Sequence, residues 1–340
     1  MNVLNSDSQR AYRRAAFFAA LVVAQATWSP TAFAQASWTP DKPVEIVVPA
    51  AAGGGTDRTA RLIQKILTDQ KAIPTPTIVV NKPGAGSSIG NRYVAQHKGD
   101  GHYLAITQPT LITDAIMGLT TIGYTSFTPL AQLGTEYNGF AVKADSPLKS
   151  AKDIIDRLKQ DPGSVSFAIS NALGSTGHIA LALVMKQAGI DPAKLTIVVF
   201  QSGGQSRTAL LGGHVDVNVT TLANLVDLVD SGMVRTLAVT APKRLPAPFA
   251  NVPTWREMGV NAVIGHWRGV VGPPEMTPEQ TAFWDKRLAA VAASDEWKAD
   301  AQKTSVEVDY MDSATSRKFL VDQYGEMDRL LSQLGLAKAN

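Results

Sequence analysis

The sequence predicts an α/β protein with two successive cores, each a mainly parallel sheet flanked by helices. Three observations support this prediction. Short runs of β-branched and apolar residues alternate with segments of helical periodicity. The alternation occurs as two sets along the chain, and 340 residues are enough for about two domains. A composition of 45% hydrophobic and 18% charged residues is typical of a globular protein.

The first 34 residues have the pattern of a secretory signal peptide. Arg10, Arg13 and Arg14 precede the apolar stretch 15–26, and residues 32–34 (AFA) form a small-x-small cleavage site. The apolar stretch is shorter than the roughly 20 residues that a membrane-spanning helix needs. We therefore expect cleavage near Ala34-Gln35, export by the general or the twin-arginine route, and a periplasmic mature chain.

The first set of elements begins with residues 44–48 (VEIVV), a predicted buried strand that Pro49 ends. A loop of small residues follows, and then a helix. Thr56 and Asp57 stand just before this helix and are residue types that commonly cap helix N-termini. The plan recurs in the strand 77–80, the loop 81–88, the helix 89–96 and the strand 103–107. Repeated strand–helix units predict a parallel sheet covered by helices.

A short strand at residues 140–142 begins the second set. The expected helices are 150–159, 178–187, a helix starting at 206–211, 278–292, 295–303 and 313–334, and the expected strands are 166–169, 196–200, 215–219, 237–240 and 269–271. Residues 242–253 are rich in proline and irregular. After this break, strand 269–271 is expected to return to the first sheet.

The loop 49–57 (PAAAGGGTD) follows a strand, and ligands of open parallel sheets bind at that edge. Glycines allow a close approach to a ligand, and the helix start presents unpaired N–H groups that can hold a carboxylate without Arg or Lys. The alternative is a tight turn in which Thr56 or Asp57 only caps the helix. The loop contains neither the Walker nor the dinucleotide glycine pattern, which argues against a nucleotide.

Residues 83–90 (PGAGSSIG) contain the Gly-x-Ser-x-Gly pattern of a nucleophile elbow. The elbow needs its strand to run straight into the first glycine, and here residues 81–85 intervene. A second loop of amides and hydroxyls that binds an anion is therefore the preferred interpretation. An esterase-like hydrolase that uses Ser88 is the alternative.

The second set of elements carries two comparable loops. Residues 170–178 (SNALGSTGH) offer Ser175, Thr176 and backbone amides at a helix start, and residues 201–205 (QSGGQ) offer a flexible loop of amides. His178 is either a ligand contact or a structural histidine. Arg268 either holds a carboxylate in two-pronged fashion or forms a salt bridge between domains.

Metal, cofactor and nucleic-acid binding are not expected. The chain has no cysteine, its five histidines lack metal-ligand spacing, and without residues 1–34 its net charge is +1, with no basic block or stripe.

In this order, the loops resemble those of the Bug, or tripartite tricarboxylate transporter (TctC-like), family of periplasmic binding proteins. The matching stretches are 43–57 (PVEIVVPAAAGGGTD), 81–90 (NKPGAGSSIG), 99–103 (GDGHY), 174–178 (GSTGH), 211–217 (LGGHVDV), 235–243 (RTLAVTAPK), 251–253 (NVP) and 267–273 (WRGVVGP). The resemblance covers essentially the whole mature chain.

The resemblance implies a two-domain, type II-like Venus-flytrap fold with two hinge crossovers. Domain 1 would comprise residues 36–139 and 267–340, and domain 2 residues 140–266. Domain 1 would hold a ligand carboxylate through its first two loops, and domain 2 would close over it. The candidate ligand-binding residues are Gly53, Gly54, Gly55, Thr56, Asp57, Ala85, Gly86, Ser87, Ser88, Thr107, Ser170, Ser175, Thr176, His178, Gly203, Gly204 and Arg268.

The implied function is that of a monomeric receptor, not an enzyme, which delivers a small carboxylate to two integral membrane subunits. A sensor that docks on a membrane receptor is a further alternative. Thr220-Thr221 stand where many members carry Asp-Asn. Members that use this Asp to bind the amino group of a ligand are therefore poor guides to the ligand of this chain. Trp267-Arg268-Gly269 is closer to the tricarboxylate-type branch. A di- or tricarboxylate is therefore favoured over an amino acid.

Overall fold

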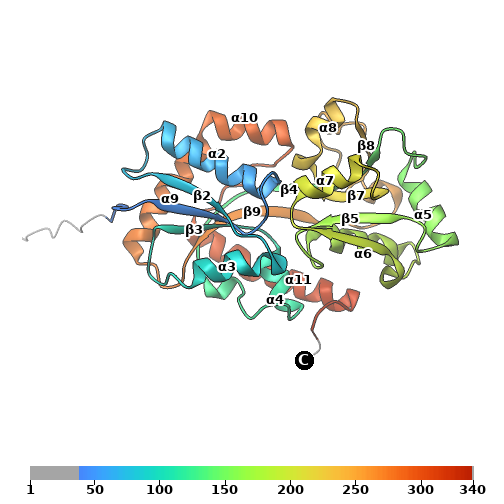
Figure 1. Cartoon of the computed structure of the whole chain (residues 1–340). Coiled ribbons are helices and arrows are strands. Elements are labelled where there is room, and N and C mark those ends of the chain that lie inside the picture. Colours follow the sequence, from blue (N-terminus) through green and yellow to red (C-terminus); the bar gives the residue numbers. More distant parts are fainter. Residues whose placement is uncertain (1–37, 339–340) are drawn as a thin grey trace, which may run out of the picture. The chain divides into compact units, whose positions relative to one another are not determined.

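The structure, a computed structural model, describes residues 38–338, which belong to one compact unit (Figure 1). The predicted signal peptide lies outside these residues. The strands are β1 (Val44–Val48), β2 (Thr77–Asn81), β3 (Tyr103–Thr107), β4 (Thr128–Lys143), β5 (Ser166–Ser170), β6 (Thr196–Phe200), β7 (Val217–Thr221), β8 (Val234–Val239) and β9 (Gly265–Gly272). The α-helices are α2 (Gly55–Asp69), α3 (Ser88–Ala95), α4 (Thr110–Ile116), α5 (Ala151–Gln160), α6 (Thr176–Gln187), α7 (Gly203–Leu211), α8 (Val226–Asp230), α9 (Pro278–Ala293), α10 (Asp295–Thr304) and α11 (Ser313–Leu334).

The strands follow the order β2-β1-β3-β9-β4-β7-β5-β6, with β8 also paired to β4. Strands β1, β2 and β3 are mutually parallel, as are β5, β6 and β7. The long strand β4 pairs antiparallel with β9 through its first part and with β7 and β8 through its last part. We call β2, β1, β3, β9 and the start of β4 the first half-sheet. The second half-sheet comprises the end of β4 with β7, β5, β6 and β8.

The first half-sheet has helices on both faces, with α2 and α10 on one side and α3 and α4 on the other (Figure 1). Side chains along a strand point alternately to opposite faces. In β1, Val44, Ile46 and Val48 therefore belong to the core with α2 and α9, whereas Val47 packs with Val94 of α3. A strand covered on both faces needs a continuous apolar run, which explains the composition of 44–48.

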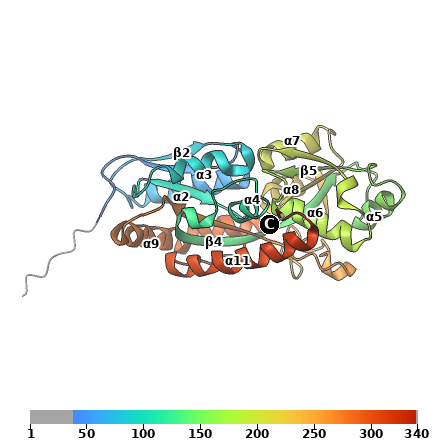
Figure 2. The ribbon, with the colours of Figure 1, turned by 90° about the horizontal axis from the view of Figure 1, so that it is seen from below.

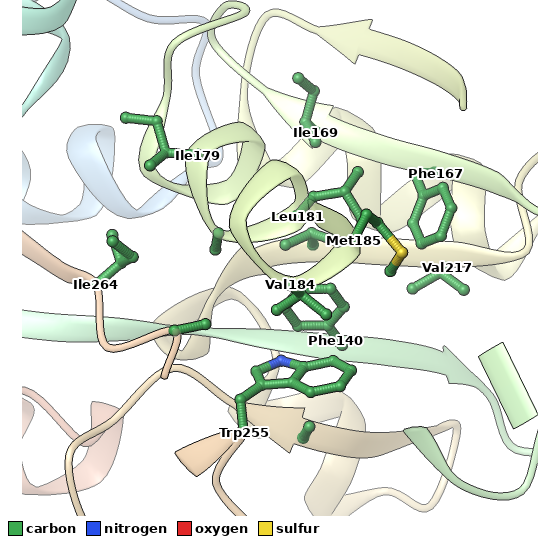
Figure 3. Close-up of a cluster of buried hydrophobic side chains, with 14 of the residues drawn as sticks. Phe140, Phe167, Ile169, Ile179, Leu181, Val184, Met185, Val217, Trp255 and Ile264 are labelled. Carbon is green, nitrogen blue, oxygen red and sulfur yellow. The ribbon is translucent and has the colours of Figure 1, made fainter. Parts of the chain in front are cut away.

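The second half-sheet is built in the same way around α6, whose apolar side chains fill the space under β5 and β7 (Figure 3). The core cluster combines residues of α6, β4, β5, β7 and the loop before β9, among them Ile179, Leu181, Val184, Met185, Phe140, Phe167, Val217 and Trp255. Burial of one such side chain contributes about 1.5–3 kcal/mol, and the cluster thus holds α6 and its first turn in place. On the opposite face, α7 and α8 pack in a second cluster.

Strand β4 is longer than the sequence indicated, because it covers 16 residues instead of 140–142. Residues 128–138 of this strand include Gln132, Glu136 and Asn138, polar residues that interrupt an apolar pattern, yet all three are at most 2% exposed. These side chains are covered because β4 passes from one half-sheet into the other. Helices α4 and α8 were also missed, being only seven and five residues long.

The last helix, α11, lies along β4 and contacts α4 and α6 (Figure 2). Leu320, Met327 and Leu331 join the same core cluster as α6. The C-terminal helix therefore supports both half-sheets where they meet. Across residues 38–338, no helix combines the length and the apolar character needed to span a membrane.

Candidate functional site

A cavity of about 30 Å³ lies between the two half-sheets. It is lined by Ala50, Gly54, Gly55, Thr56, Gln108, Asn138, Ser170, Asn171, Ser175, Thr176, Gly177, Ser202, Gly203, Val219, Thr220, Thr221, Asn224, His266 and Arg268. Eight of the candidate residues are therefore brought together: Gly54, Gly55, Thr56, Ser170, Ser175, Thr176, Gly203 and Arg268.

Three helices begin at this cavity. The N-cap residues are Gly54 for α2, Ser175 for α6 and Ser202 for α7, and all three line the cavity. A helix start has unpaired N–H groups and carries roughly half a positive elementary charge. The three starts together give the cavity a positive potential from backbone dipoles, which suits an anionic group.

Thr56 and Asp57 do not cap α2, because the cap is Gly54 and both residues lie within the first turn. The Thr56 hydroxyl donates to Gln108 Oε1 at 3.0 Å and faces the cavity. The Asp57 carboxylate instead accepts hydrogen bonds from Gly53 N–H at 3.1 Å and Arg61 Nε at 2.9 Å. Burial opposes its charge, but these bonds outweigh burial and lower the pKa of Asp57. Asp57 thus braces the glycine-rich loop and does not line the cavity.

Arg268 lines the cavity, but its guanidinium is already engaged. Its Nη2 forms a buried ion pair with Glu136 of β4, and its Nη1 donates to Thr56 Oγ1 at 3.0 Å. Glu136 also accepts a hydrogen bond from Ala223 N–H at 3.3 Å. This ion pair joins strands β9 and β4, and both residues fall in the expected domain 1, so it is not the salt bridge between domains that the sequence analysis considered. A carboxylate bound by Arg268 stays a prediction.

The two half-sheets touch closely beside the cavity. Ala51 N–H donates to Gln201 O at 3.2 Å, and a Cβ added at Gly204 would lie 2.6 Å from Gly53 O. Only glycine therefore fits at this contact. Gly53 and Gly204 form this border of the cavity and are not among the residues that line it.

Asn224 connects the half-sheets from the short turn after β7. Its Oδ1 accepts from Gly55 N–H at 3.1 Å, and its Nδ2 donates to Thr220 Oγ1 at 3.1 Å and Thr221 Oγ1 at 3.0 Å. This wall of the cavity is therefore a neutral cluster of hydroxyls and an amide. The cluster contains no carboxylate that would pair with an ammonium group.

The second loop of the first half-sheet, with Ala85, Gly86, Ser87 and Ser88, does not line the cavity. Ser87 Oγ lies 3.3 Å from Thr110 Oγ1. Ser88 Oγ is buried and has no hydrogen-bond partner within residues 38–338. It therefore lacks the histidine contact that a nucleophile elbow requires.

Gly86 adopts φ +65° and has no room for a side chain. A Cβ there would lie 2.9 Å from Asp114 Oδ2 and 3.2 Å from Ala172 Cβ. Asp114 is 2% exposed, and burial raises its pKa to about 8. The loop thus packs against a buried, protonated carboxyl group near the second half-sheet.

His178 and Thr107 also lie away from the cavity. His178 Nδ1 accepts from Gly174 N–H at 2.9 Å, and burial lowers the pKa of the imidazole to about 4. Its contacts are those of a structural histidine that holds the loop before α6. Thr107 lines a separate small pocket with Trp267 and Phe319.

Several residues of the cavity were not among the candidate ligand-binding residues, although Ala50, Asn171, Gly177 and Ser202 lie in the loops that the sequence analysis singled out. The full set is Ala50, Gln108, Asn138, Asn171, Gly177, Ser202, Val219, Thr220, Thr221, Asn224 and His266. Ser202 is the N-cap of α7 and follows a strand, so the same strand–loop–helix reasoning would have found it. Asn138 and His266 lie on the crossing strands β4 and β9, where no local pattern marks a polar residue as functional.

Two curated relatives are similar over most of the chain. A protein of Cupriavidus necator from the gbd 5′ region is 28% identical over 316 residues, which cover 90% of this chain and 91% of the relative. The protein BugT of Bordetella pertussis is 28% identical over 254 residues, which cover 73% of this chain and 76% of BugT.

Solved structures show the same fold. The periplasmic binding protein BugD matches with a TM-score of 0.81 and 24% identity, covering 88% of this chain and all of BugD. A structure from R. palustris with adipate matches with a TM-score of 0.79 and 28% identity, covering 88% of this chain and 99% of that one. The two-domain periplasmic binding protein fold expected from the sequence is thereby confirmed.

The family model of the tripartite tricarboxylate transporter family receptor matches residues 59–336. Receptors of this kind bind solutes, so the prediction that the chain is not an enzyme is confirmed and the hydrolase alternative is not supported. Because the match covers most of the chain, this protein belongs to the receptor family of tripartite tricarboxylate transporters.

Proposed function

We propose that this chain is a periplasmic receptor that captures a small organic carboxylate between its half-sheets and delivers it to integral membrane transporter subunits. The observation that supports this proposal best is the convergence of the α2, α6 and α7 N-termini on one cavity. Their amides and the nearby hydroxyls offer donors to a carboxylate. No bond of the ligand needs to be broken for this role.

The charge balance of the cavity fits such a ligand. Arg268 contributes a cation, but Glu136 compensates its charge, so a carboxylate is held mainly by amides and helix dipoles. Hydrogen bonds to such preformed donors strengthen where water is excluded. The adipate in the R. palustris structure supports a dicarboxylate, in line with the preference for a di- or tricarboxylate from the sequence.

Ligand entry requires the half-sheets to separate. A cavity of about 30 Å³ is far smaller than the roughly 300–1,000 Å³ of sites that bury drug-sized ligands. We propose that residues 36–139 with 267–340 and residues 140–266 are the two domains, and that β4 and the segment leading into β9 are the hinge. Closure about such crossovers is a common response of binding proteins.

The contact at Gly204 provides a direct test of closure. Gly204→Ala places a methyl group 2.6 Å from Gly53 O, which prevents the half-sheets from meeting, and we expect at least a tenfold loss of carboxylate affinity by calorimetry. The matched control is Gly325→Ala in α11, where the new Cβ would meet only Arg329 Nη1 at an ordinary 3.8 Å. Equal affinities of the two variants would contradict closure at this contact.

The ligand class is tested by thermal unfolding of the mature chain with citrate, C4–C6 dicarboxylates, aromatic acids and amino acids. A ligand that binds only the folded state raises the melting temperature with its occupancy. We expect a shift with di- or tricarboxylates and none with amino acids. Refolding from denaturant beforehand removes any ligand carried through purification, so the lack of any shift after refolding would refute the proposal.

Delivery to a membrane transporter is separable from ligand binding. A deletion strain should lose uptake of the identified ligand and regain it with the restored chain. Unchanged uptake combined with a lost transcriptional response to the ligand would instead support the sensor alternative.

A further inference from the structure

Three buried polar atoms at the cavity have no hydrogen-bond partner among residues 38–338. They are Ser175 Oγ, Asn138 Nδ2 and His266 Nε2, on residues that are 4%, 1% and 4% exposed. All three residues line the cavity. A buried polar group left unpaired costs about 1–3 kcal/mol, so three of them at one cavity require an explanation.

The three atoms come from different parts of the fold. Asn138 lies in β4, His266 in β9, and Ser175 is the N-cap of α6. Ser175 does not use its side chain to cap its own helix, although serine at this position commonly does so. Its hydroxyl is therefore available to a group in the cavity.

The hydrogen bond between Thr176 and His266 determines what His266 offers. Thr176 Oγ1 lies 2.7 Å from His266 Nδ1. Burial, reinforced by the charge of Arg268, holds the pKa of His266 well below its usual value, so the ring is neutral and carries one N–H. The only partner of the Thr176 hydroxyl within residues 38–338 is His266. If this hydroxyl donates to Nδ1, the ring proton is on Nε2, which then donates into the cavity.

Asn138 Nδ2 is also a donor, and the Ser175 hydroxyl can donate as well. We propose that His266, Asn138 and Ser175 form a subsite for an acceptor oxygen at the second end of the ligand, apart from the carboxylate held at α2 and α7. This inference rests on the proposed function and specifies its substrate class. The ligand is a small acid with a second carboxylate or carbonyl oxygen.

Thr176 is a positioning residue in this arrangement. Thr176→Val removes the hydroxyl that fixes Nδ1 as an acceptor, so the protein no longer selects one ring tautomer, and Nε2 carries the proton in only part of the molecules. Nitrogen-15 NMR of the His266 ring should report a single Nε2–H form in the unaltered chain and a mixture of the two tautomers in Thr176→Val. Thr176→Ser should restore the original form, which a purely structural role of Thr176 would not predict.

The subsite is tested with three ligands of one chain length within C4–C6: the diacid, its monoamide and the monoacid. The unaltered chain should bind the diacid and the monoamide at least tenfold more tightly than the monoacid. His266→Phe and Thr176→Val should each reduce this preference at least threefold, because they weaken binding of the diacid and the monoamide more than binding of the monoacid. Tighter binding of the diacid than of the monoamide would show that the negative charge of the second carboxylate adds to the affinity that its acceptor oxygen provides.

His97→Phe is the matched control, because it makes the same substitution in a ring that stacks on Tyr103 outside the cavity, and it should leave the preference unchanged. If His266→Phe does not fold, Thr176→Val and its NMR signature carry the test. Equal binding of all three ligands by the unaltered chain, or equal losses for all three in the variants, would overturn the subsite but leave the proposed function intact. Failure to bind any of the acids would overturn both.

Discussion

Replacing Glu136 by Gln is expected to lower the free energy of unfolding by about 3–5 kcal/mol, the usual cost of removing one partner of a buried ion pair. The side chains of Glu136 and Arg268 are 1% and 8% exposed. The variant leaves the guanidinium charge buried without its counter-charge. The loss is expected in urea unfolding at pH 7, where ΔG extrapolates linearly to zero denaturant.

The double variant Glu136→Gln with Arg268→Met separates the cost of an unpaired charge from that of lost packing. Replacing a whole buried ion pair by groups of similar volume is often nearly neutral, so the double variant should be more stable than Glu136→Gln alone. Two neighbouring residues of one network are expected to be non-additive. Additive losses in the double variant would show that Glu136 acts independently of Arg268.

The second large effect is that of pH on stability, for which we expect a maximum near pH 6.5. Above this pH the controlling group is Asp114, whose pKa burial raises to about 8, compared with about 3.9 in an unfolded chain. The folded state then binds one proton more than the unfolded state, so stability falls as pH rises. Between pH 6.5 and pH 8, where Asp114 becomes half ionised, this group alone costs about 1.6 kcal/mol. Two buried histidines, which are still losing protons in the unfolded state over this interval, offset roughly half of that cost, so the net loss is about 1 kcal/mol.

Below pH 6.5 two buried histidines reverse the pH dependence, so that stability decreases as the pH falls. Burial lowers the pKa of His178 to about 4 and that of His266 well below its usual value, whereas an unfolded histidine titrates near 6.5. The unfolded state therefore takes up two protons that the folded state does not. The one proton bound by folded Asp114 offsets only one of these, so stability falls as pH decreases from 6.5 toward 4.

The variant Asp114→Asn tests the upper limb of this profile. It removes the titrating group at similar volume, so the free energy of unfolding should no longer fall between pH 6.5 and pH 8 and should instead rise slightly as the unfolded histidines lose their protons. His178→Gln should instead weaken the fall below pH 6.5, and the loss of stability above pH 6.5 should persist in this variant. A wild-type stability that stays flat between pH 6.5 and pH 8 would contradict the burial of an uncharged Asp114.

Most of the regular elements could be predicted from local patterns. The apolar run 44–48 and the helix 313–334 match β1 and α11, because both depend on periodicity within one segment. The long strand β4 could not be predicted in full. Gln132, Glu136 and Asn138 interrupt its apolar pattern, and the strand forms because it pairs with β9, β7 and β8, which are distant in sequence.

The same distinction holds for the candidate site. The order of strand, loop and helix identified the three loops at which α2, α6 and α7 begin, although the helices start two or three residues earlier than expected, at Gly55, Thr176 and Gly203. The sequence by itself therefore determined which loops present backbone donors. Asn138, Asn224 and His266 were decided only by the tertiary structure, because no nearby residue in the chain marks them as polar contacts of a cavity. Asn138 and His266 reach it because β4 and β9 pair at the junction of the half-sheets. Asn224 reaches it from the turn after β7 and accepts a hydrogen bond from Gly55 N–H, so side chains distant in sequence meet at the three helix starts.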